Sequence, residues 1–247
     1  MFNISRTIYP LQTALEDFLC DESIKLGLFT ADQLTESKTI LEDDSELSLS
    51  QYLSRLDSSK NIKKTAEARL LLFLGSFSCS KNQDVHDFLT TDRCISFEKR
   101  NRCRTYLILN EENEILGYFS LALKTLFAQR KKLTNSIRKK INPGKCCASF
   151  PEDIDYYNVF LIGQIGRNDS FESKDLSLSD FFSEIFSILV EVQNKVGGSS
   201  VLIEVDNNQK LINLYKEHGF QHLDTDQEDL SQLLILFDGI NLSFQNF

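Results

Sequence analysis

The sequence predicts an α/β protein in which a mixed, mostly antiparallel sheet carries helices on both faces. Three observations support this prediction. From residue 69 onward, apolar runs rich in β-branched and aromatic residues alternate with segments of helical periodicity. Two of these runs flank the short polar turn "NEENE" at 110–114, as in a hairpin. Two others enclose a long amphipathic segment at 179–196, which predicts a right-handed parallel β-α-β crossover.

The composition is that of a soluble globular protein, with 41% hydrophobic and 26% charged residues among 247. The net charge of −9 argues against general nucleic-acid binding, which requires neutralisation of phosphates. The chain shows neither a secretory signal nor an apolar run long enough to cross a bilayer, so we expect a cytoplasmic protein without membrane contact. Its six cysteines form no CxxC pair, so we expect free thiols and no metal site.

Residues 1–62 differ from the remainder, because they are acidic and rich in Ser and Leu. The apolar spacing of Leu11, Leu15, Phe18 and Leu19 is helical. We interpret this part as an acidic helical N-terminal extension of two or three short helices, followed by a domain at 63–247. Removal of the extension is therefore expected to leave a folded domain.

The first elements of the domain follow from local pattern. The run "RLLLFLGSFSC" at 69–79 is predicted as a buried strand, and 84–102 as one helix. The two runs around "NEENE", together spanning 104–126, are predicted to form an antiparallel hairpin.

A basic excursion at 124–150 follows the hairpin. Up to residue 145 it contains no acidic residue, and its cations are Lys124, Arg130, Lys131, Lys132, Arg138, Lys139, Lys140 and Lys145. The two "RKK" clusters lie eight residues apart, which places both on one face if the segment is helical. Three interpretations are open: a solvated helix, docking onto the acidic extension, and contact with an external polyanion such as RNA or an acidic protein.

The last five elements are the clearest. They are a strand at 156–169, a helix at 179–196 between a Ser start and a Gly-Gly end, a strand at 200–205, a helix at 207–220 and a strand at 231–237.

The helix "NNQKLINLYKEHGF" carries the most specific motif of the chain. Asn208, the pair Leu214–Tyr215 and the pair Gly219–Phe220 match the pattern N-x-x-A-x-x-L-Y-x-x-x-G-F, with Leu211 in place of Ala. The sequence from 69 to 237 resembles the GNAT superfamily of acetyl-CoA-dependent N-acetyltransferases, and in particular its compact bacterial members. The resemblance implies acetyl transfer from acetyl-CoA to an amine, by direct attack in a ternary complex.

The same resemblance implies roles for individual residues. Tyr215 would protonate the leaving thiolate of coenzyme A, because a phenol stays protonated at neutral pH. The alternative is that Tyr215 is a core aromatic packed on Phe220. The backbone of Gln164, Ile165, Gly166 and Arg167 would line the pantetheine arm, and Asn208 would lie at the same site.

The phosphate-binding loop departs from the family pattern. Family members carry glycines before the long helix, whereas this chain carries Ser177, Leu178 and Ser179. Glycines let backbone N–H groups approach a pyrophosphate, and serines offer hydroxyls instead. Arg167 and Lys174 flank the loop and would serve the anionic co-substrate, or lie solvated at the surface.

Glu204 is the candidate general base. It lies on the strand "SVLIEV", where alternation places Val201, Ile203 and Val205 on one face and Glu204 on the other. Burial would raise the pKa of its carboxyl toward that of a base, whereas a Lys or Arg partner would make it structural. The acceptor amine is open: a protein, an aminoacyl-tRNA or a metabolite. The alternative function is a GNAT-fold binding protein without catalysis, acting on a protein or RNA, which the missing glycines favour.

Overall fold

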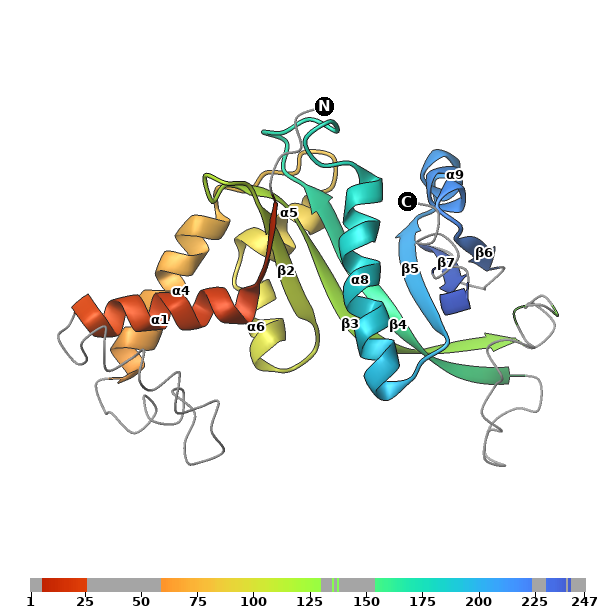
Figure 1. Cartoon of the computed structure of the whole chain (residues 1–247), viewed down its shortest axis with the longest axis horizontal. Helices are drawn as coiled ribbons and strands as arrows, with labels where there is room; N and C mark the ends of the chain where they lie inside the picture. The colour runs from red at the N-terminus through yellow and green to blue at the C-terminus, as the bar shows by residue number, and fades with distance from the viewer. Residues whose placement is uncertain are drawn as a thin grey trace.

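The computed structural model describes residues 6–25, 59–129, 135, 137, 154–223, 230–238 and 240. The elements in chain order (Figure 1) are β1 Thr7–Pro10, α1 Leu11–Lys25, α4 Ser59–Leu74, α5 Gln83–Thr90, α6 Arg93–Lys99, β2 Arg104–Leu109, β3 Ile115–Gln129, β4 Ile154–Arg167, α8 Leu178–Val196, β5 Ser200–Asp206, α9 Gln209–Glu217, β6 Gln221–Leu223 and β7 Leu230–Leu236.

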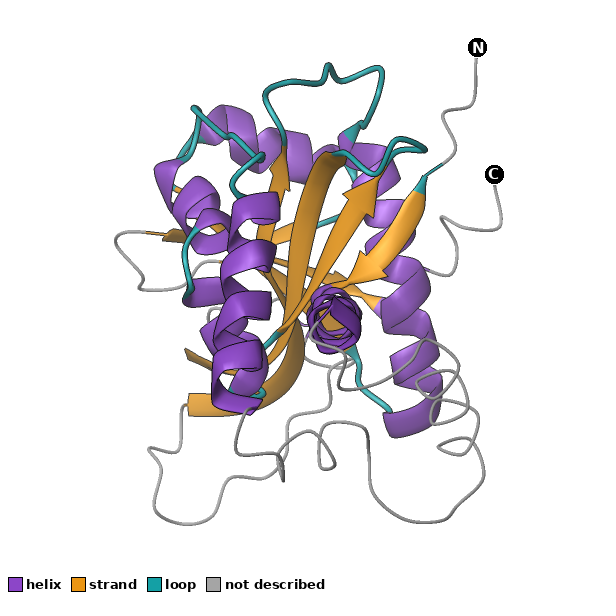
Figure 2. Ribbon diagram, turned by 90° about the vertical axis from the view of Figure 1, so that its left-hand side faces the viewer, coloured by secondary structure: helices purple, strands orange, loops and turns teal. Residues whose placement is uncertain are grey.

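The seven strands form one sheet in the order β1-β2-β3-β4-β5-β7-β6. Only β4 and β5 pair in parallel, and every other neighbouring pair is antiparallel. The predicted hairpin is confirmed as β2 and β3, and the predicted parallel connection as β4, α8 and β5. Helices cover both faces of the sheet (Figure 2), as the α/β prediction requires.

Strand alternation divides the core between these two faces. Ile108 of β2 joins the cluster under α8 and α9, whereas its neighbours Leu107 and Leu109 join the cluster under α1, α4, α5 and α6. On β5, Val201, Ile203 and Val205 face α8, as predicted from the sequence. The faces are therefore set by the two-residue period of each strand.

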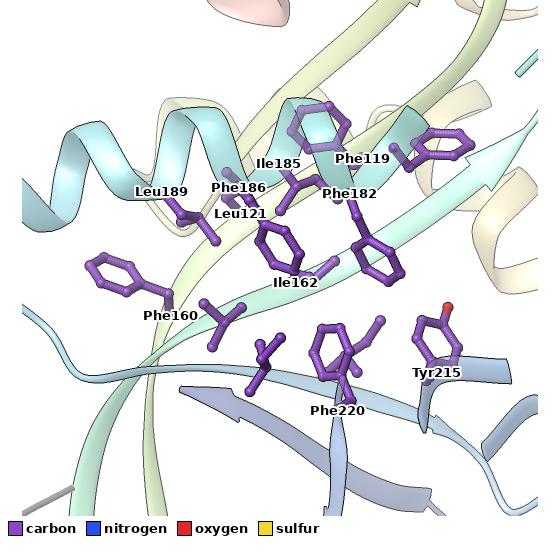
Figure 3. Packing of buried hydrophobic residues seen from close by; sticks show 14 of the residues in the cluster. Phe119, Leu121, Phe160, Ile162, Phe182, Ile185, Phe186, Leu189, Tyr215 and Phe220 are labelled. Atoms are coloured by element: carbon purple, nitrogen blue, oxygen red, sulfur yellow. The ribbon is translucent and has the colours of Figure 1, made fainter. Parts of the chain in front are cut away.

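Helix α8 supplies the centre of the larger cluster. Ser177 caps it in a reciprocal capping box with Asp180, and it ends at Gly197 with φ 79°. Its buried stripe packs on the sheet beside Tyr215 and Phe220 (Figure 3) and consists of Phe181, Phe182, Ile185, Phe186 and Leu189. The predicted helix, with its Ser start and Gly-Gly end, is thus confirmed.

The strand predicted at 69–79 is wrong, because its first six residues complete helix α4. Ala66, Leu70 and Leu74 are fully buried at four-residue spacing, while Leu72 remains 79% exposed. A short apolar run fits both the two-residue period of a strand and the 3.6-residue period of a helix. The helix-forming residues in "KKTAEAR" decide in favour of the helix.

The single helix predicted at 84–102 is instead two helices. Thr91 adopts an extended conformation after α5. Its hydroxyl donates to the carbonyl oxygen of Asp87 at 2.6 Å and accepts from the backbone N–H of Arg93 at 3.3 Å. A threonine side chain here competes for backbone groups, which ends α5 and begins α6.

The N-terminal part joins the same sheet and core. Strand β1, which was not predicted, pairs with β2, and Leu11 and Ala14 of α1 are buried against α4. The division at residue 62 stays a prediction, and α4 begins before it. The short strand β6 was also not predicted.

The basic excursion lies mostly outside the described residues. Its first six residues, 124–129, continue β3 as a strand rather than starting a helix. Thr125 and Phe127 pair there with Asn158 and Tyr156 of β4. The predicted helical face of the two "RKK" clusters is not described, and its three interpretations stay open.

Candidate active site

A cleft opens where the two parallel strands separate. Strands β4 and β5 pair only at Phe160–Ile162 with Val201–Ile203. Beyond these three pairs β4 continues along β3, and β5 continues along β7. The backbone edges of β4 and β5 beyond the split have no strand partner within the described part of the chain. They border a cleft of about 1260 Å³.

A β-bulge marks the point of separation. Ser120 of β3 pairs with Gln164, and the next residue, Leu121, pairs with Ile162, so Gly163 is the extra residue. A bulge bends the strand and increases its local twist, which turns the end of β4 away from β5. The lining of the cleft includes predicted residues from both strands and from α9: Gln164, Ile165, Gly166, Arg167, Glu204, Asn208 and Tyr215.

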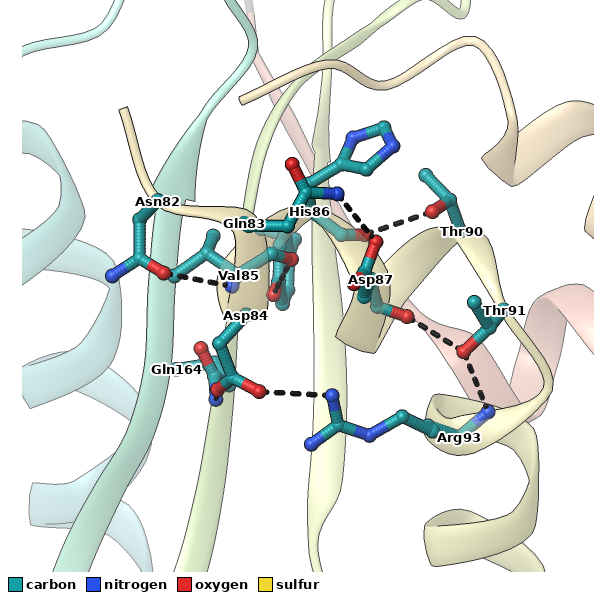
Figure 4. Close-up of polar contacts among 11 residues, drawn as sticks. Asn82, Gln83, Asp84, Val85, His86, Asp87, Thr90, Thr91, Arg93 and Gln164 are labelled. Carbon is teal, nitrogen blue, oxygen red and sulfur yellow. Dashed lines mark hydrogen bonds and ion pairs between the residues drawn. The ribbon is translucent and has the colours of Figure 1, made fainter. Parts of the chain in front are cut away.

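Helix α5 forms one wall of the cleft. A Cβ at Gly166 would collide with the side chain of Val85, so the glycine allows α5 to lie directly on β4. Asp84 accepts from Arg93 at 2.9 Å and from the side-chain amide of Gln164 at 2.9 Å (Figure 4). These two hydrogen bonds lower the pKa of Asp84, and the one from Arg93 has the larger effect. The carboxylate of Asp84 therefore stays ionised at the cleft.

The side chains of Asn168 and Asp169 hold the loop before α5 in place, and the sequence did not predict this contact. Asn168 is 3% exposed. Its amide donates to the carbonyls of Ser76 and Ile115 at 3.3 and 2.8 Å and accepts from the backbone N–H of Ser78 at 3.2 Å. Asp169 accepts from the backbone N–H of Ser80 at 2.6 Å. These contacts join positions between 53 and 92 apart in sequence, so no local pattern could reveal them.

Helix α9 places Tyr215 in the cleft. Asn208 caps the helix by accepting from the N–H of Lys210 at 2.9 Å. Gly219 has φ 89°, and the N–H of Phe220 reaches the carbonyl of Tyr215 at 3.3 Å, as expected for a glycine-terminated helix. The ring of Tyr215 packs edge-on against Phe220, with centroids 6.0 Å apart. The predicted helix end and its aromatic contact are confirmed.

The hydroxyl group of Tyr215 is the distinctive feature of the site. The residue is 5% exposed, yet its hydroxyl makes no hydrogen bond to any described residue. Burial raises the pKa of the phenol to about 12. Tyr215, labelled in Figure 3 beside the hydrophobic cluster, is therefore a protonated phenol with an unused donor. It belongs to the lining of the cleft.

Glu204 is held in a polar network. Both of its carboxylate oxygens lie 2.6 Å from the Nζ of Lys124, and Oε1 also accepts from the amide of Gln232 at 2.7 Å. Its side chain is 16% exposed. Glu204 thus has the cationic partner that favours a structural role. Lys124, the first cation of the basic excursion, is used in this ion pair within the chain.

The other predicted loop residues lie outside the cleft lining. Ser177 is used by the capping box of α8, and Leu178 packs against the core. Lys174 is exposed and pairs with Glu172 at 3.1 Å. Ser179 is exposed on the first turn of α8. Tyr215, Glu204, Asn208 and the end of β4 line one cleft. Lys174, Ser177, Leu178 and Ser179 do not line it.

The described residues contain no cluster of His, Cys, Asp or Glu suited to a metal ion. None of their helices is both long and apolar enough to span a bilayer.

No protein-family model and no curated protein matches the sequence significantly. Solved structures do match. The toxin AtaT in complex with acetyl-methionyl-tRNAfMet shares 22% identity at a TM-score of 0.53, covering 69% of this chain and 91% of that one. A tyrosine-to-phenylalanine mutant of KacT shares 18% at 0.53, covering 68% and 89%. A further bacterial toxin shares 14% at 0.52, covering 70% and 88%. AtaT and KacT are GNAT-fold acetyltransferases, and the chain described here has the GNAT fold.

Proposed function

We propose that this protein is an N-acetyltransferase that moves the acetyl group of acetyl-CoA to an amine. The observation that carries the proposal is Tyr215, whose ring is buried and whose protonated hydroxyl has no hydrogen-bond partner among the described residues, at the cleft between β4 and β5. A phenol placed in this way can donate a hydrogen bond to a ligand in the cleft. The likeness to GNAT-fold acetyltransferases supports the same function.

The end of β4 fits the pantetheine arm of acetyl-CoA. Residues 164–167 pair with β3 on one side and leave their other edge toward the cleft. An extended arm with two amide groups can hydrogen-bond to such an edge as an added strand does. This edge is open because β4 pairs with β5 only at Phe160–Ile162.

The chemistry that the residues perform follows from this placement. Acetyl-CoA supplies the acetyl group as a thioester when it is bound. We propose that the edge of β4 orients the thioester so that the acceptor amine attacks it directly, in a ternary complex. As the C–S bond breaks, Tyr215 donates its proton to the departing sulfur, and the proton that the amine nitrogen loses restores the phenol. Glu204 and Lys124 form a fixed ion pair beside the reaction and set its electrostatic environment.

Aminoacyl-tRNA is the acceptor class to test first, since AtaT has been solved with acetyl-methionyl-tRNAfMet. A protein amine is the next class, because AtaT has also been solved with its antitoxin AtaR and acetyl-CoA bound. An external polyanion contact by segment 124–145 would favour tRNA, and Lys124 is already committed to Glu204. Assay of methionyl-tRNA, peptide amines and small amines with labelled acetyl-CoA separates these classes.

The second candidate is a binding protein without catalysis. The observation that favours it is the loop before α8, where Ser177 and Asp180 satisfy each other in the capping box. A chain that does not bind an acetyl donor would have no need of a free Tyr215 hydroxyl. Titration with acetyl-CoA therefore discriminates between the two functions.

Acetyl-CoA is expected to raise the melting temperature of the full chain. A ligand that binds the folded state alone stabilises it by about 2.7 kcal/mol at a hundred times its Kd. Differential scanning fluorimetry measures the shift, with ATP as the control because it shares the adenine and phosphates but lacks the pantetheine arm. An unchanged melting temperature at millimolar acetyl-CoA would contradict the enzymatic proposal and favour the binding protein.

Replacement of Lys124 by Met is expected to lower stability by about 1–3 kcal/mol, because it leaves the largely buried carboxylate of Glu204 without its cation. The double variant with Glu204→Gln should recover part of this loss, since it removes the charge that Lys124 compensates. Urea denaturation measures both. If Lys124→Met alone is neutral, the pair contributes nothing to the fold, and Glu204 returns as a candidate base.

A further inference from the structure

One face of helix α9 lines the cleft. Its cleft residues form two pairs spaced four positions apart, as one helix face requires: Lys210 with Leu214, and Leu211 with Tyr215. Lys210 lies in the first turn, which Asn208 holds by accepting from the N–H of Lys210 at 2.9 Å. One helix therefore presents both an amine and the phenol of Tyr215 to the same space.

The direction of the side chains brings these two groups toward each other. Lys210 and Tyr215 are five positions apart on α9, which corresponds to a rise of about 7.5 Å. Helical side chains lean toward the N-terminus of their helix, so the ring of Tyr215 extends back toward the turn that carries Lys210. The lysine amine is carried by a flexible four-carbon stem that can swing toward the phenol. A thioester placed for protonation by Tyr215 therefore lies on the side of α9 that this amine reaches.

The amine of Lys210 has no partner in the described part of the chain. The residue is exposed, and its side chain makes no hydrogen bond or ion pair with a described residue. Its neighbours on the cleft face, Leu211 and Leu214, offer it no counter-ion. Four other lysines are each paired with a carboxylate at 2.5–3.1 Å: Lys99, Lys124, Lys174 and Lys195. Lys210 is thus available as a nucleophile once its ammonium has given a proton to water.

Lys81 also lines the cleft, but from the loop before α5. This loop is held at the end of β4, where the N–H of Ser80 donates to Asp169 at 2.6 Å. The hydrogen bonds from Ser80 lower the pKa of Asp169, and the nearby charge of Lys81 lowers it further. Lys81 therefore lies near a carboxylate and on a different element from Tyr215. Of the two lysines in the described lining, Lys210 is the better placed acceptor.

We propose that the protein acetylates its own Lys210, within one chain, from acetyl-CoA bound in the cleft. The proposal rests on the proposed function, because it uses the same donor and the same phenol. After the ammonium has lost a proton to water, the Nζ of Lys210 bonds to the acetyl carbon and the C–S bond breaks. The sulfur leaves with the proton of Tyr215, and the proton that the nitrogen loses restores the phenol.

Acetylation of Lys210 changes the charge of the cleft. The basic residues of its described lining are Lys81, Arg167 and Lys210, and acetylation makes the last of them neutral. Acetyl-CoA is an anion, so the modified chain should bind it more weakly. Lys210→Gln is neutral like the modified side chain, and Lys210→Arg keeps the charge. Isothermal titration should show acetyl-CoA binding about two- to fivefold more weakly to the Gln variant than to the Arg variant, and equal affinities would contradict this consequence.

Incubation of the full chain with deuterium-labelled acetyl-CoA, followed by peptide mass spectrometry, tests the proposal. Lys216 is the internal control, because it is exposed on the same helix, has no side-chain partner among the described residues and lies outside the cleft lining. Lys210 should be labelled at least about a hundredfold faster than Lys216, because the bound thioester is held beside it. The rate constant should not depend on protein concentration. Equal labelling of the two lysines, preferred labelling of Lys81, or a rate constant that rises with protein concentration overturns the proposal.

The variant Tyr215→Phe separates enzymatic from passive labelling. It should slow the labelling of Lys210 by about 10²- to 10⁴-fold and leave that of Lys216 unchanged. An unchanged rate at Lys210 shows passive chemistry and overturns the proposal. If acetyl-CoA raises the melting temperature but Lys210 stays unlabelled, self-acetylation is wrong and the proposed function stands. If acetyl-CoA neither stabilises nor labels the chain, both are wrong.

Discussion

Replacing Tyr215 with Phe is expected to lower turnover by about 10²- to 10⁴-fold, the usual contribution of a positioned acid. The change removes only the hydroxyl, which has no partner among the described residues, so the free energy of unfolding should stay nearly constant. The phenyl ring keeps its packing on Phe182 and Phe220, with centroids at 5.9 and 6.0 Å. Steady-state kinetics and urea denaturation measure the two quantities, and acetyl-CoA affinity should be unchanged.

Tyr106→Phe is the matched control for this experiment. Tyr106 is a half-buried tyrosine that stacks on Phe119 and lies outside the cleft lining, so its hydroxyl should not affect turnover. The pH profile adds a further check. Since burial raises the pKa of Tyr215 to about 12, its ionisation should cause no loss of activity below about pH 10. Normal turnover with a stability loss of about 1 kcal/mol would instead identify Tyr215 as a core aromatic.

A chain that begins at residue 63 is expected to lose cooperative folding, in contrast to the tolerance predicted from composition. The truncation removes β1, which pairs with β2. Leu11 and Ala14, which belong to the buried cluster under α1, α4, α5 and α6, are removed with it. It also removes the start of α4 and the ion pair of Arg6 with Asp180. The exposed apolar face should give a compact state that binds ANS and lacks near-UV circular dichroism.

The point variant Leu11→Ala tests the same contact within the full chain. It should cost about 2–5 kcal/mol, the usual loss for a fully buried leucine. Gln12→Ala serves as its control, because Gln12 is exposed on the same turn. A truncated chain that melts cooperatively would contradict this prediction and support the division at residue 62.

The sequence predicts best those elements whose start and end are marked by residues close to them in the chain. Helix α9 has a capping Asn, an apolar stripe and a glycine end, and each of these acts within a few residues. The strand prediction at 69–79 failed because the five consecutive apolar residues 70–74 fit a strand as well as a helix, and the tertiary packing of α4 decides between the two. Strand β1 is four residues long and is stabilised by β2, about a hundred positions later, so its own pattern carries little signal.

The candidate site shows the same limit. Tyr215 and the end of β4 follow from a motif, whereas the ion pair of Glu204 joins positions 80 apart. The loop before α8 illustrates a different difficulty. Its missing glycines were evident from the sequence, but the hydrogen bonds from the N–H groups of Glu172 and Ser177 to the carboxylates of Asp175 and Asp180 depend on the conformation of the loop.

The three residue pairs between β4 and β5 have a mechanical consequence. Among the described residues they are the only pairing between two parts of the sheet, β1–β4 and β5–β7, and this pairing is far shorter than either part. Helix α8 packs across it, since the buried residues of α8 share one cluster with Ile162 of the first part and Ile203 of the second. The size of side chains such as Ile185 should therefore influence the angle between the two parts of the sheet and the width of the cleft. Under the proposed function, we expect substitutions at Ile185 to change which acyl groups the cleft accepts.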